Sequence, residues 1–270
     1  MMLDDNAIIE TQDLTKRFGD LTAVDKLAIT VQAGEIFGLL GPNGAGKSTV
    51  IKMLTTLLPP TSGSAYVAGL DVTRKSAAVR GLIGYVPQLI SADSMLSGYE
   101  NLLIFAKLYS IPKAKREKLV RGALEFMGLT DAANNIVRKY SGGMIRRLEI
   151  AQSMLHRPRI LFLDEPTIGL DPSARHVVWD HVTRLRRENG TTIFMTTHLM
   201  DEADAVCNRI AIMHRGKVVA LGSPAALKAS IGREGATLDD VFIHYAGDSM
   251  ESGGSYRETS RIRRISRRMG

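Results

Sequence analysis

The chain has 270 residues, of which 44% are hydrophobic and 23% are charged, a composition that suits a globular domain with a sizeable buried core. Its single cysteine, Cys207, excludes a disulfide within the chain and favours a reducing compartment. The net charge of +7 is uneven: residues 255–270 hold six arginines and one glutamate (+5), which leaves +2 for all other residues.

No segment of the sequence has the pattern of a signal peptide or of a membrane span. The first five residues are acidic where a signal peptide is basic, and no long apolar stretch follows them. No run of 18 or more apolar residues occurs, so no transmembrane helix is predicted. Work at a membrane would therefore require a partner.

The first third of the chain predicts strands and one helix. Residues 7–32 have the composition of short strands separated by turns, and residues 35–40 predict a buried strand. A glycine-rich loop follows, and residues 48–57 then predict a helix that Pro59 and Pro60 would end. Residues 61–87 return to strand-like runs.

The next segment, from about residue 90 to 157, predicts helices. Ser97 and Glu100 fit a capping box at the start of the first helix, a second helix is expected over residues 113–127, and a third begins after Ser141. Pro158 would close the third helix. The segment therefore has the character of a helical insert.

The remainder of the chain alternates strands with helices. Strands are expected at residues 160–163, 192–196 and 210–213, with a helix over 173–188 between the first two. This alternation predicts an α/β fold with a mostly parallel sheet. Residues 248–270 are rich in Ser, Gly and Arg, and we expect them to form a mostly disordered tail.

The glycine-rich loop matches the pattern G-x-x-x-x-G-K-[ST]. Its glycines let several backbone N–H groups point at one phosphate, and the helix that follows adds its positive N-terminal end. Lys47 would place a charge on the β- and γ-phosphates, and Ser48 would offer its hydroxyl to Mg²⁺. The predicted nucleotide-binding residues of the loop are Gly41, Asn43, Gly44, Ala45, Gly46, Lys47, Ser48 and Thr49.

Two acids, Asp164 and Glu165, end the apolar strand predicted at residues 160–163. Burying charge is costly unless something compensates it, and Mg²⁺ would do so. Asp164 would then bind the metal, and Glu165 would polarise the attacking water. The alternative is a strand that simply leaves the core into a solvated turn.

With these two motifs, five further segments in a fixed order make residues 8–245 resemble an ABC ATPase. They are Lys-Arg-Phe-Gly at 16–19, Tyr-Val-Pro-Gln at 85–88 (Q-loop), Tyr-Ser-Gly-Gly-Met at 140–144 (signature), Gly-Leu-Asp-Pro at 169–172 (D-loop) and Thr-Thr-His at 196–198 (switch histidine). The resemblance implies a P-loop NTPase (RecA-like) α/β core, an N-terminal antiparallel β subdomain and an inserted α-helical subdomain at about 89–157. The ATPase domain would span residues 7–245, with a basic tail over 246–270.

The resemblance also implies roles for single residues. Phe18 would stack on adenine, Gln88 would join Mg²⁺ to the partner interface, and His198 would hold the γ-phosphate and water. The catalytic residues would be Glu165, His198 and Gln88, and the metal-binding residues Ser48, Gln88 and Asp164. Taken alone, Phe18 could be a core residue, Gln88 a surface turn residue, His198 a structural histidine, and Ser141 and Asp171 helix caps.

The resemblance implies head-to-tail pairing of two cassettes. The signature residues Ser141, Gly142 and Gly143 of one subunit, together with Asp171, would contact the nucleotide held by the other. A helix that begins at the signature would present free N–H groups to an anion. ATP hydrolysis should therefore require a dimer, either of two copies of this chain or with a second ABC cassette.

The signature departs from the commonest form, because Tyr140 and Met144 stand where Leu and Gln are usual. This variant, and Leu-Asp-Asp-Val-Phe at 238–242, resemble the drug-export branch of the daunorubicin-resistance type. The implied function is ATP hydrolysis that drives export of drugs or other small amphipathic molecules through a separate transmembrane permease.

A non-transport ABC ATPase that acts on nucleic acid or ribosomes is the alternative, and a nucleotide-binding regulator is a third class. Lys47 and Ser141 are only 94 positions apart, too close for the long coiled-coil insert of chromosome proteins. Glu165 and His198 argue against an inert regulator. The arginines at 255–270 could contact an anionic membrane surface, whereas nucleic acid is less favoured because aromatic residues are not interleaved among them. The expected location is the cytoplasmic face of the cell membrane.

Overall fold

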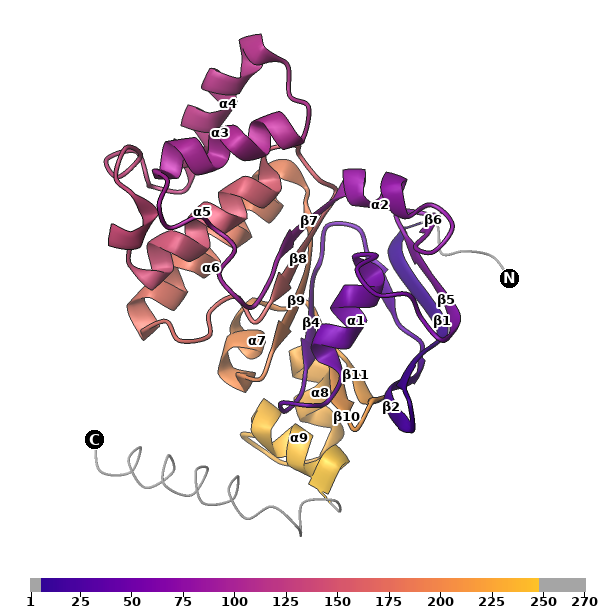
Figure 1. Ribbon diagram of the computed structural model, residues 1–270. Coiled ribbons are helices and arrows are strands. Elements are labelled where there is room, and N and C mark those ends of the chain that lie inside the picture. The colour runs from indigo at the N-terminus through magenta and orange to yellow at the C-terminus, as the bar shows by residue number, and fades with distance from the viewer. Residues whose placement is uncertain (1–5, 248–270) are drawn as a thin grey trace, which may run out of the picture.

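A computed structural model describes residues 6–247, and a six-stranded sheet runs through its centre (Figure 1). The strand order is β11-β10-β4-β9-β8-β7, and every neighbouring pair is parallel except β10 with β11. The strands are β4 (Ile36–Leu40), β7 (Ile83–Val86), β8 (Ile160–Asp164), β9 (Thr192–Thr197), β10 (Arg209–His214) and β11 (Lys217–Gly222). β4, β8 and β9 are buried at every position, as expected for parallel strands covered on both faces.

A second, antiparallel sheet is built mainly from the N-terminal segment. Its strand order is β2-β1-β5-β6, and β3 also pairs with β1. The strands are β1 (Ala7–Phe18), β2 (Leu21–Leu27), β3 (Thr30–Gln32), β5 (Ser62–Val67) and β6 (Leu70–Asp71).

Helices cover both faces of the central sheet. In Figure 1, α1 lies between the central sheet and the antiparallel sheet, α5 and α6 lie on the opposite face, and α3 and α4 lie beyond α5. The helices are α1 (Lys47–Leu54), α2 (Ser76–Leu82), α3 (Gly98–Leu108), α4 (Lys113–Phe126), the 3₁₀ turn η1 (Val137–Lys139), α5 (Gly142–Met154), α6 (Pro172–Asn189), α7 (Met200–Val206), α8 (Pro224–Ser230) and α9 (Leu238–Ala246).

This architecture confirms the predicted fold class, a parallel α/β core with an antiparallel β unit and a helical insert. Helices α3, α4 and α5 lie in the chain between the adjacent parallel strands β7 and β8. The capping box at the start of α3 is present, because Ser97 and Glu100 satisfy each other's backbone N–H groups. Among residues 6–247, no helix is long and apolar enough to cross a membrane.

Several predicted elements need correction. α1 ends at Leu54 rather than at the prolines, because Thr56 adopts a left-handed φ of 65° that a helix cannot continue. The short strand expected at the N-terminus is one long strand, β1. α2 lies in a stretch that was predicted as strand. Its sequence shows no helical pattern of apolar residues because Val79 is the one buried residue of this helix.

The C-terminal part extends beyond the last predicted strand, with β11, α8 and α9 after β10. The tail predicted over 246–270 lies outside the described residues, apart from Ala246 and Gly247 at the end of α9.

Three aromatic rings form a row across the central strands. Phe37 on β4, Phe194 on β9 and Phe162 on β8 occupy paired positions, and the middle ring lies 5.5 Å from each neighbour, centroid to centroid. All three are fully buried in the core shared with α1 and the antiparallel sheet. The packing of these rings therefore stabilises the arrangement of the three strands that lead to the glycine-rich loop, to Asp164 and to His198.

Replacing the central ring should destabilise the domain strongly. We expect Phe194→Ala to lower the free energy of unfolding by about 3–5 kcal/mol, because the cavity would be closed on all sides. The matched control Phe18→Ala, at a ring that is 49% exposed, should change it by less than about 0.5 kcal/mol. Urea denaturation of the full chain measures both, and similar small losses would contradict a structural role for the row.

Candidate functional site

The glycine-rich loop leaves β4 and leads directly into α1. Gly44 and Gly46 have φ values of 81° and 107°. A side chain at Gly41 would come within 2.2 Å of the Met213 carbonyl oxygen, and one at Gly46 within 2.4 Å of the Ala23 carbonyl oxygen. Glycine is therefore required at these two positions by close backbone contact, and α1 begins without a side-chain cap on its first N–H groups.

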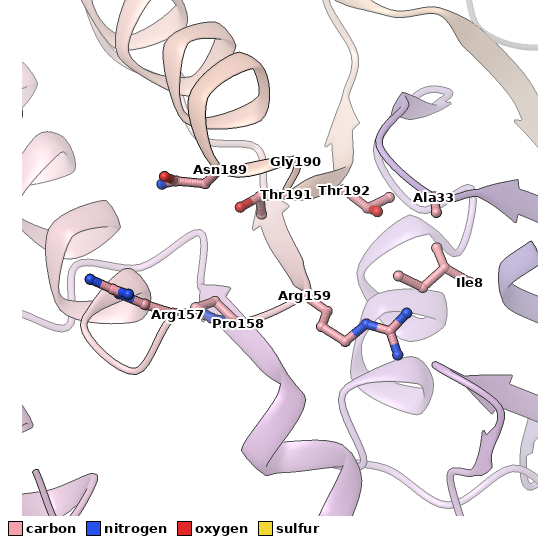
Figure 2. Close-up of a pocket in the computed structure, with 9 residues that line it drawn as sticks. All are labelled: Ile8, Ala33, Arg157, Pro158, Arg159, Asn189, Gly190, Thr191 and Thr192. Atoms are coloured by element: carbon pink, nitrogen blue, oxygen red, sulfur yellow. The ribbon is translucent and has the colours of Figure 1, made fainter. Parts of the chain in front are cut away.

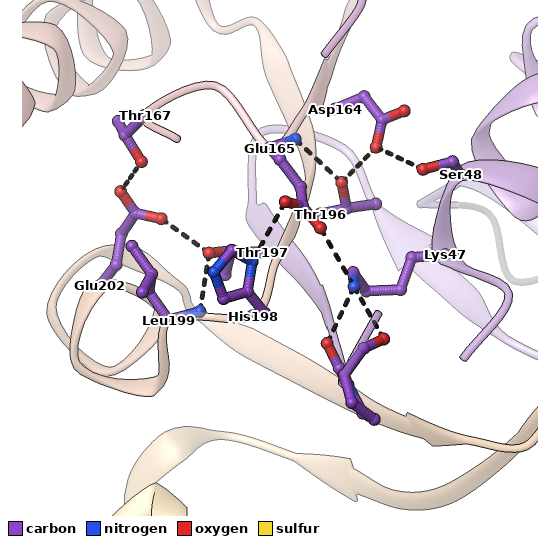
Figure 3. A network of polar contacts seen from close by, with 12 residues as sticks. Lys47, Ser48, Asp164, Glu165, Thr167, Thr196, Thr197, His198, Leu199 and Glu202 are labelled. Carbon is purple, nitrogen blue, oxygen red and sulfur yellow. Dashed lines mark hydrogen bonds and ion pairs between the residues drawn. The ribbon is translucent and has the colours of Figure 1, made fainter. Parts of the chain in front are cut away.

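Lys47, the first residue of α1, is only 4% exposed. Its Nζ donates to the carbonyl oxygens of Gly41 and Pro42, at 2.8 and 3.1 Å, and forms an ion pair with Glu165 Oε1 at 3.1 Å (Figure 3). The ammonium group thus lies between the loop and the carboxylate that follows β8.

Asp164, the last residue of β8, is bound by two hydroxyl groups. Ser48 Oγ donates to its Oδ1 at 3.1 Å, and Thr196 Oγ1 donates to the same oxygen at 2.6 Å. Asp164 and Thr196 are paired across β8 and β9, so the register of the sheet sets this contact. Burial of Tyr85 raises the pKa of its hydroxyl group to about 12, and the negative charge of Asp164 adds to this shift.

The hydroxyl of Ser48 and the carboxylate of Asp164 are oxygen groups of the kind that Mg²⁺ prefers. Among residues 6–247, no cluster of three or more His, Cys, Asp or Glu side chains could hold a metal. Mg²⁺ in phosphate sites commonly takes one or two carboxylates together with substrate phosphates, and Asp164 provides one carboxylate, with the Ser48 hydroxyl 3.1 Å from its Oδ1.

Glu165 lies at the centre of the polar network. Its φ is 48°, an uncommon conformation for a residue with a side chain, and its N–H donates to the Thr196 Oγ1 at 3.0 Å. Its carboxylate joins Lys47 on one side and His198 Nδ1 on the other, each at 3.1 Å. His198 follows β9 and its side chain is 34% exposed, so the histidine forms the open side of this arrangement.

Another buried acid, Glu202 on α7, lies on the side of His198 that faces away from Lys47 (Figure 3). Its carboxylate accepts hydrogen bonds from Thr197 Oγ1 at 2.9 Å, from Trp179 Nε1 and from the Thr167 hydroxyl. Sequence reasoning missed Glu202, because its partners Trp179 and Thr167 are 23 and 35 positions away in the chain. Its position links the residues before His198 with those that follow Glu165.

The other predicted residues lie apart from Lys47. Ser141 caps α5, where its side chain accepts a hydrogen bond from the Met144 N–H at 3.3 Å. Asp171 caps α6, where its carboxylate accepts a hydrogen bond from the Ala174 N–H at 2.9 Å. Within residues 6–247, no hydrogen bond or ion pair joins Ser141, Gly142 or Gly143 to the Lys47 network. Both cap interpretations are therefore confirmed.

Gln88 and Phe18 are both exposed. The Gln88 carbonyl oxygen accepts from Arg146 at 3.1 Å, and its side chain borders a pocket of about 670 Å³ together with Gly142 and Gly169. Phe18 is 49% exposed at the end of β1, with Lys16 Nζ 5.2 Å from its ring centroid, so the core interpretation of Phe18 is wrong. An exposed ring remains available to stack on a planar ligand.

A smaller pocket, of about 270 Å³, lies at the other edge of the central sheet (Figure 2). It is lined by the starts of β8 and β9, including Arg159, Thr191 and Thr192. The glycine-rich loop and Glu165 follow the C-terminal ends of parallel strands, whereas this pocket lies at the N-terminal ends of β8 and β9. The pocket is therefore separate from the Lys47 network.

Comparisons with known proteins identify the family to which this sequence and fold belong. The sequence model of the family described as ABC transporter matches residues 24–168. The chain is 46% identical over 224 residues to the daunorubicin/doxorubicin resistance ATP-binding protein DrrA of Streptomyces peucetius, covering 83% of this chain and 68% of that protein. It is 40% identical over 256 residues to the Nod factor export ATP-binding protein I of Burkholderia lata, covering 92% and 84%.

A third relative is the probable multidrug ABC transporter ATP-binding protein YbhF of Escherichia coli, which is 43% identical over 245 residues. The match covers 89% of this chain and 42% of YbhF. Among solved structures, an ATP-binding subunit of an ABC transporter superposes with a TM-score of 0.78 at 27% identity, covering 88% of this chain and 99% of that one. CbiO1 of Clostridium perfringens, part of an ABC transporter complex, gives 0.78 at 28% identity, with 84% and 92% covered. The chain therefore belongs to the ABC transporter family, as an ATP-binding subunit with ATPase activity.

Proposed function

We propose that this chain hydrolyses ATP at two sites formed between two cassettes and thereby drives a separate permease that exports small amphipathic molecules. The observation that carries the proposal is the convergence of Lys47, Glu165 and His198 at one edge of the sheet, beside the Ser48–Asp164 pair. We also propose residues 7–245 as the ATPase domain, with residues 89–157 as its helical subdomain.

In this proposal the loop residues from Gly41 to Thr49 enclose the phosphates, and Phe18 stacks on adenine. Lys47 neutralises the β- and γ-phosphates, which compete with Glu165 for its ammonium group. When bound, Mg²⁺ spreads the negative charge of the phosphates, and Ser48, Asp164 and Gln88 are the residues that would hold it.

Glu165 then accepts a hydrogen bond from the attacking water and directs its oxygen at the γ-phosphorus. The water–phosphorus bond forms as the bond from the γ-phosphorus to the bridging oxygen breaks, and ADP leaves. His198 orients Glu165 and contacts the γ-phosphate. Catalysis of this kind depends on positioning and charge rather than on a covalent intermediate.

The Glu165→Gln variant should separate binding from hydrolysis. The amide keeps the size of the side chain but loses its negative charge, so we expect nucleotide affinity within a few fold and a turnover number reduced by about 10²-fold or more. Fluorescent-nucleotide titration and phosphate release measure the two quantities. Undiminished turnover would remove Glu165 from this role.

The position of the signature supports the proposal that a second cassette is needed. Ser141 and Gly142 are exposed at the N-terminal end of α5, where backbone N–H groups and the helix dipole favour an anion. Their exposure supports a role at the site of a partner chain, whose nucleotide these groups could contact. We propose a homodimer, with Asp171 beside the signature at the shared interface.

Two inactive variants should complement each other if the sites are shared in this way. Lys47→Ala removes the phosphate-binding charge, and Ser141→Arg blocks the signature, so each variant alone should lack hydrolysis. In a mixed dimer one site has both defects and the other has neither, so an equal mixture should regain about a quarter of the unchanged rate. Phosphate release from the mixture measures this, and no recovery despite mixed dimers on native mass spectrometry would contradict shared sites.

The permease would dock on an exposed apolar surface that begins beside Gln88. We call it the docking surface, and it consists of Leu89, Ile90, Met95, Ile104 and Leu108, which are 41–81% exposed. Exposed apolar side chains that lie near one another favour a protein partner. Such a partner would hold the chain at the cytoplasmic face of the membrane, and the names of the drug-resistance and Nod factor export relatives support export of amphipathic cargo.

The docking surface can be tested by pull-down from detergent-solubilised membranes in high salt, which screens the arginines at 255–270. We expect a polytopic membrane protein in near-stoichiometric amount, and its loss in the Leu89→Glu, Ile90→Glu variant. Leu57→Glu is the matched control, since Leu57 is 59% exposed but lies at the end of α1. Ribosomal proteins or nucleic acid in place of a membrane protein would contradict the transport function.

A further inference from the structure

A buried ion pair on α5 holds the segment of residues 87–91, which we call the Gln88 segment. Arg146 and Glu149 lie one turn apart, and Arg146 Nη1 is 3.0 Å from Glu149 Oε2. Their side chains are only 6% and 1% exposed. Burial lowers the pKa of the Arg146 guanidinium, and the negative charges of Glu149 and Asp164 oppose this shift.

The remaining hydrogen bonds of both side chains go to the Gln88 segment. Arg146 donates to the carbonyl oxygens of Pro87 and Gln88, at 2.7 and 3.1 Å. Glu149 Oε1 accepts from the backbone N–H and the hydroxyl of Ser91, at 2.5 and 2.9 Å. Two side chains of one helix therefore grip the segment on both sides of Leu89 and Ile90.

Burial of its own side chains cannot hold the Gln88 segment in place. Leu89 is 81% exposed and Ile90 is 63% exposed, and Gln88 is exposed as well. An ion pair in the core is also a poor device for stability, because an apolar pair of the same volume often stabilises as well or better. The effect that an apolar pair could not reproduce is therefore the set of hydrogen bonds from Arg146 and Glu149 to residues 87–91.

We propose that Arg146 and Glu149 are positioning residues for ATP hydrolysis, acting by fixing the Gln88 segment to the helix that begins at Ser141. The inference rests on the proposed function and deepens it, since Gln88 and Ser141 belong to the two complementary half-sites. A displacement of the docking surface at Leu89 and Ile90 then moves the signature end of α5 with it. The 670 Å³ pocket bordered by Gln88, Gly142 and Gly169 lies between the parts that this clamp joins.

A double-mutant cycle on the full chain tests whether the pair acts through Gln88. We expect Glu149→Gln to lower the turnover number by about tenfold, with KM for ATP changed by less than about twofold, because the phosphate-binding residues are untouched. In a Gln88→Ala background the same change should lower turnover by less than about a further twofold. A merely structural defect would multiply with the loss in Gln88→Ala, and that outcome would overturn the proposal.

The matched control is Arg147→Met on the same helix. Arg147 donates to the carbonyl oxygens of Met127 and Gly128, at the end of α4, and not to the Gln88 segment. Its replacement should leave turnover within about twofold of the unchanged protein. An equal loss in both variants would show that any disturbance of α5 suffices, and would contradict a specific clamp.

Hydrogen exchange gives a readout that needs no hydrolysis. Glu149→Gln should speed exchange of the Ser91 amide by about tenfold or more while the amides of β4 and β9 stay protected. If that variant fails to fold, Arg146→Lys replaces it, because a single ammonium cannot donate in the same fork to the Pro87 and Gln88 carbonyl oxygens. Unchanged hydrogen exchange over residues 87–91 in a folded variant would overturn the clamp. An unaltered turnover number for ATP in Glu165→Gln would overturn the proposed function alone.

Discussion

The parallel pairing of β4, β9 and β8 is the constraint on which the rest of the site depends. Leu40 is paired with Thr197, and Asp164 with Thr196, so the three strands end at one level. Because they run in the same direction, the glycine-rich loop, the two acids and His198 all emerge at the same edge of the sheet. A slip of one residue in β8 would turn Asp164 to the other face and break both hydroxyl contacts. The row of aromatic rings below this edge makes such a slip costly.

The charges at this edge compensate one another. Lys47 and Glu165 are both almost fully buried, and removing one partner of such a pair costs about 3–5 kcal/mol because the other charge is left unpaired. In the proposed function, a nucleoside triphosphate would bring its own negative charge to Lys47 and would leave the ammonium group compensated when Glu165 is displaced. Glu165 would then keep His198 as its partner and have a free carboxylate oxygen. The same contacts thus stabilise the fold and leave Glu165 able to exchange partners.

The sequence predicted the parts of this protein that local chemistry specifies. The glycine-rich loop, the two acids at the end of β8 and the capping box of α3 each follow from residue types at fixed spacing. The end of α1 did not, because a left-handed Thr56 is set by packing rather than by composition. Glu202 and the Arg146–Glu149 pair were missed because their partners are remote in the chain: Glu202 contacts Thr167 and Glu149 contacts Ser91. Long-range polar contacts of this kind carry no periodic signal in a single sequence.

Close packing joins the signature and the D-loop of one chain into a continuous surface. A Cβ at Gly142 would lie 3.0 Å from the Leu170 side chain, and one at Gly143 would lie 3.0 Å from the Ala174 side chain on α6, so both glycines pack closely against the segment around Asp171. That segment continues directly from Glu165 through Thr167, whose hydroxyl is held by Glu202. The groups offered to a partner chain are therefore connected by short, bonded paths to the groups that would act on the chain's own nucleotide. In the proposed dimer, these contacts would lie between the two nucleotide sites.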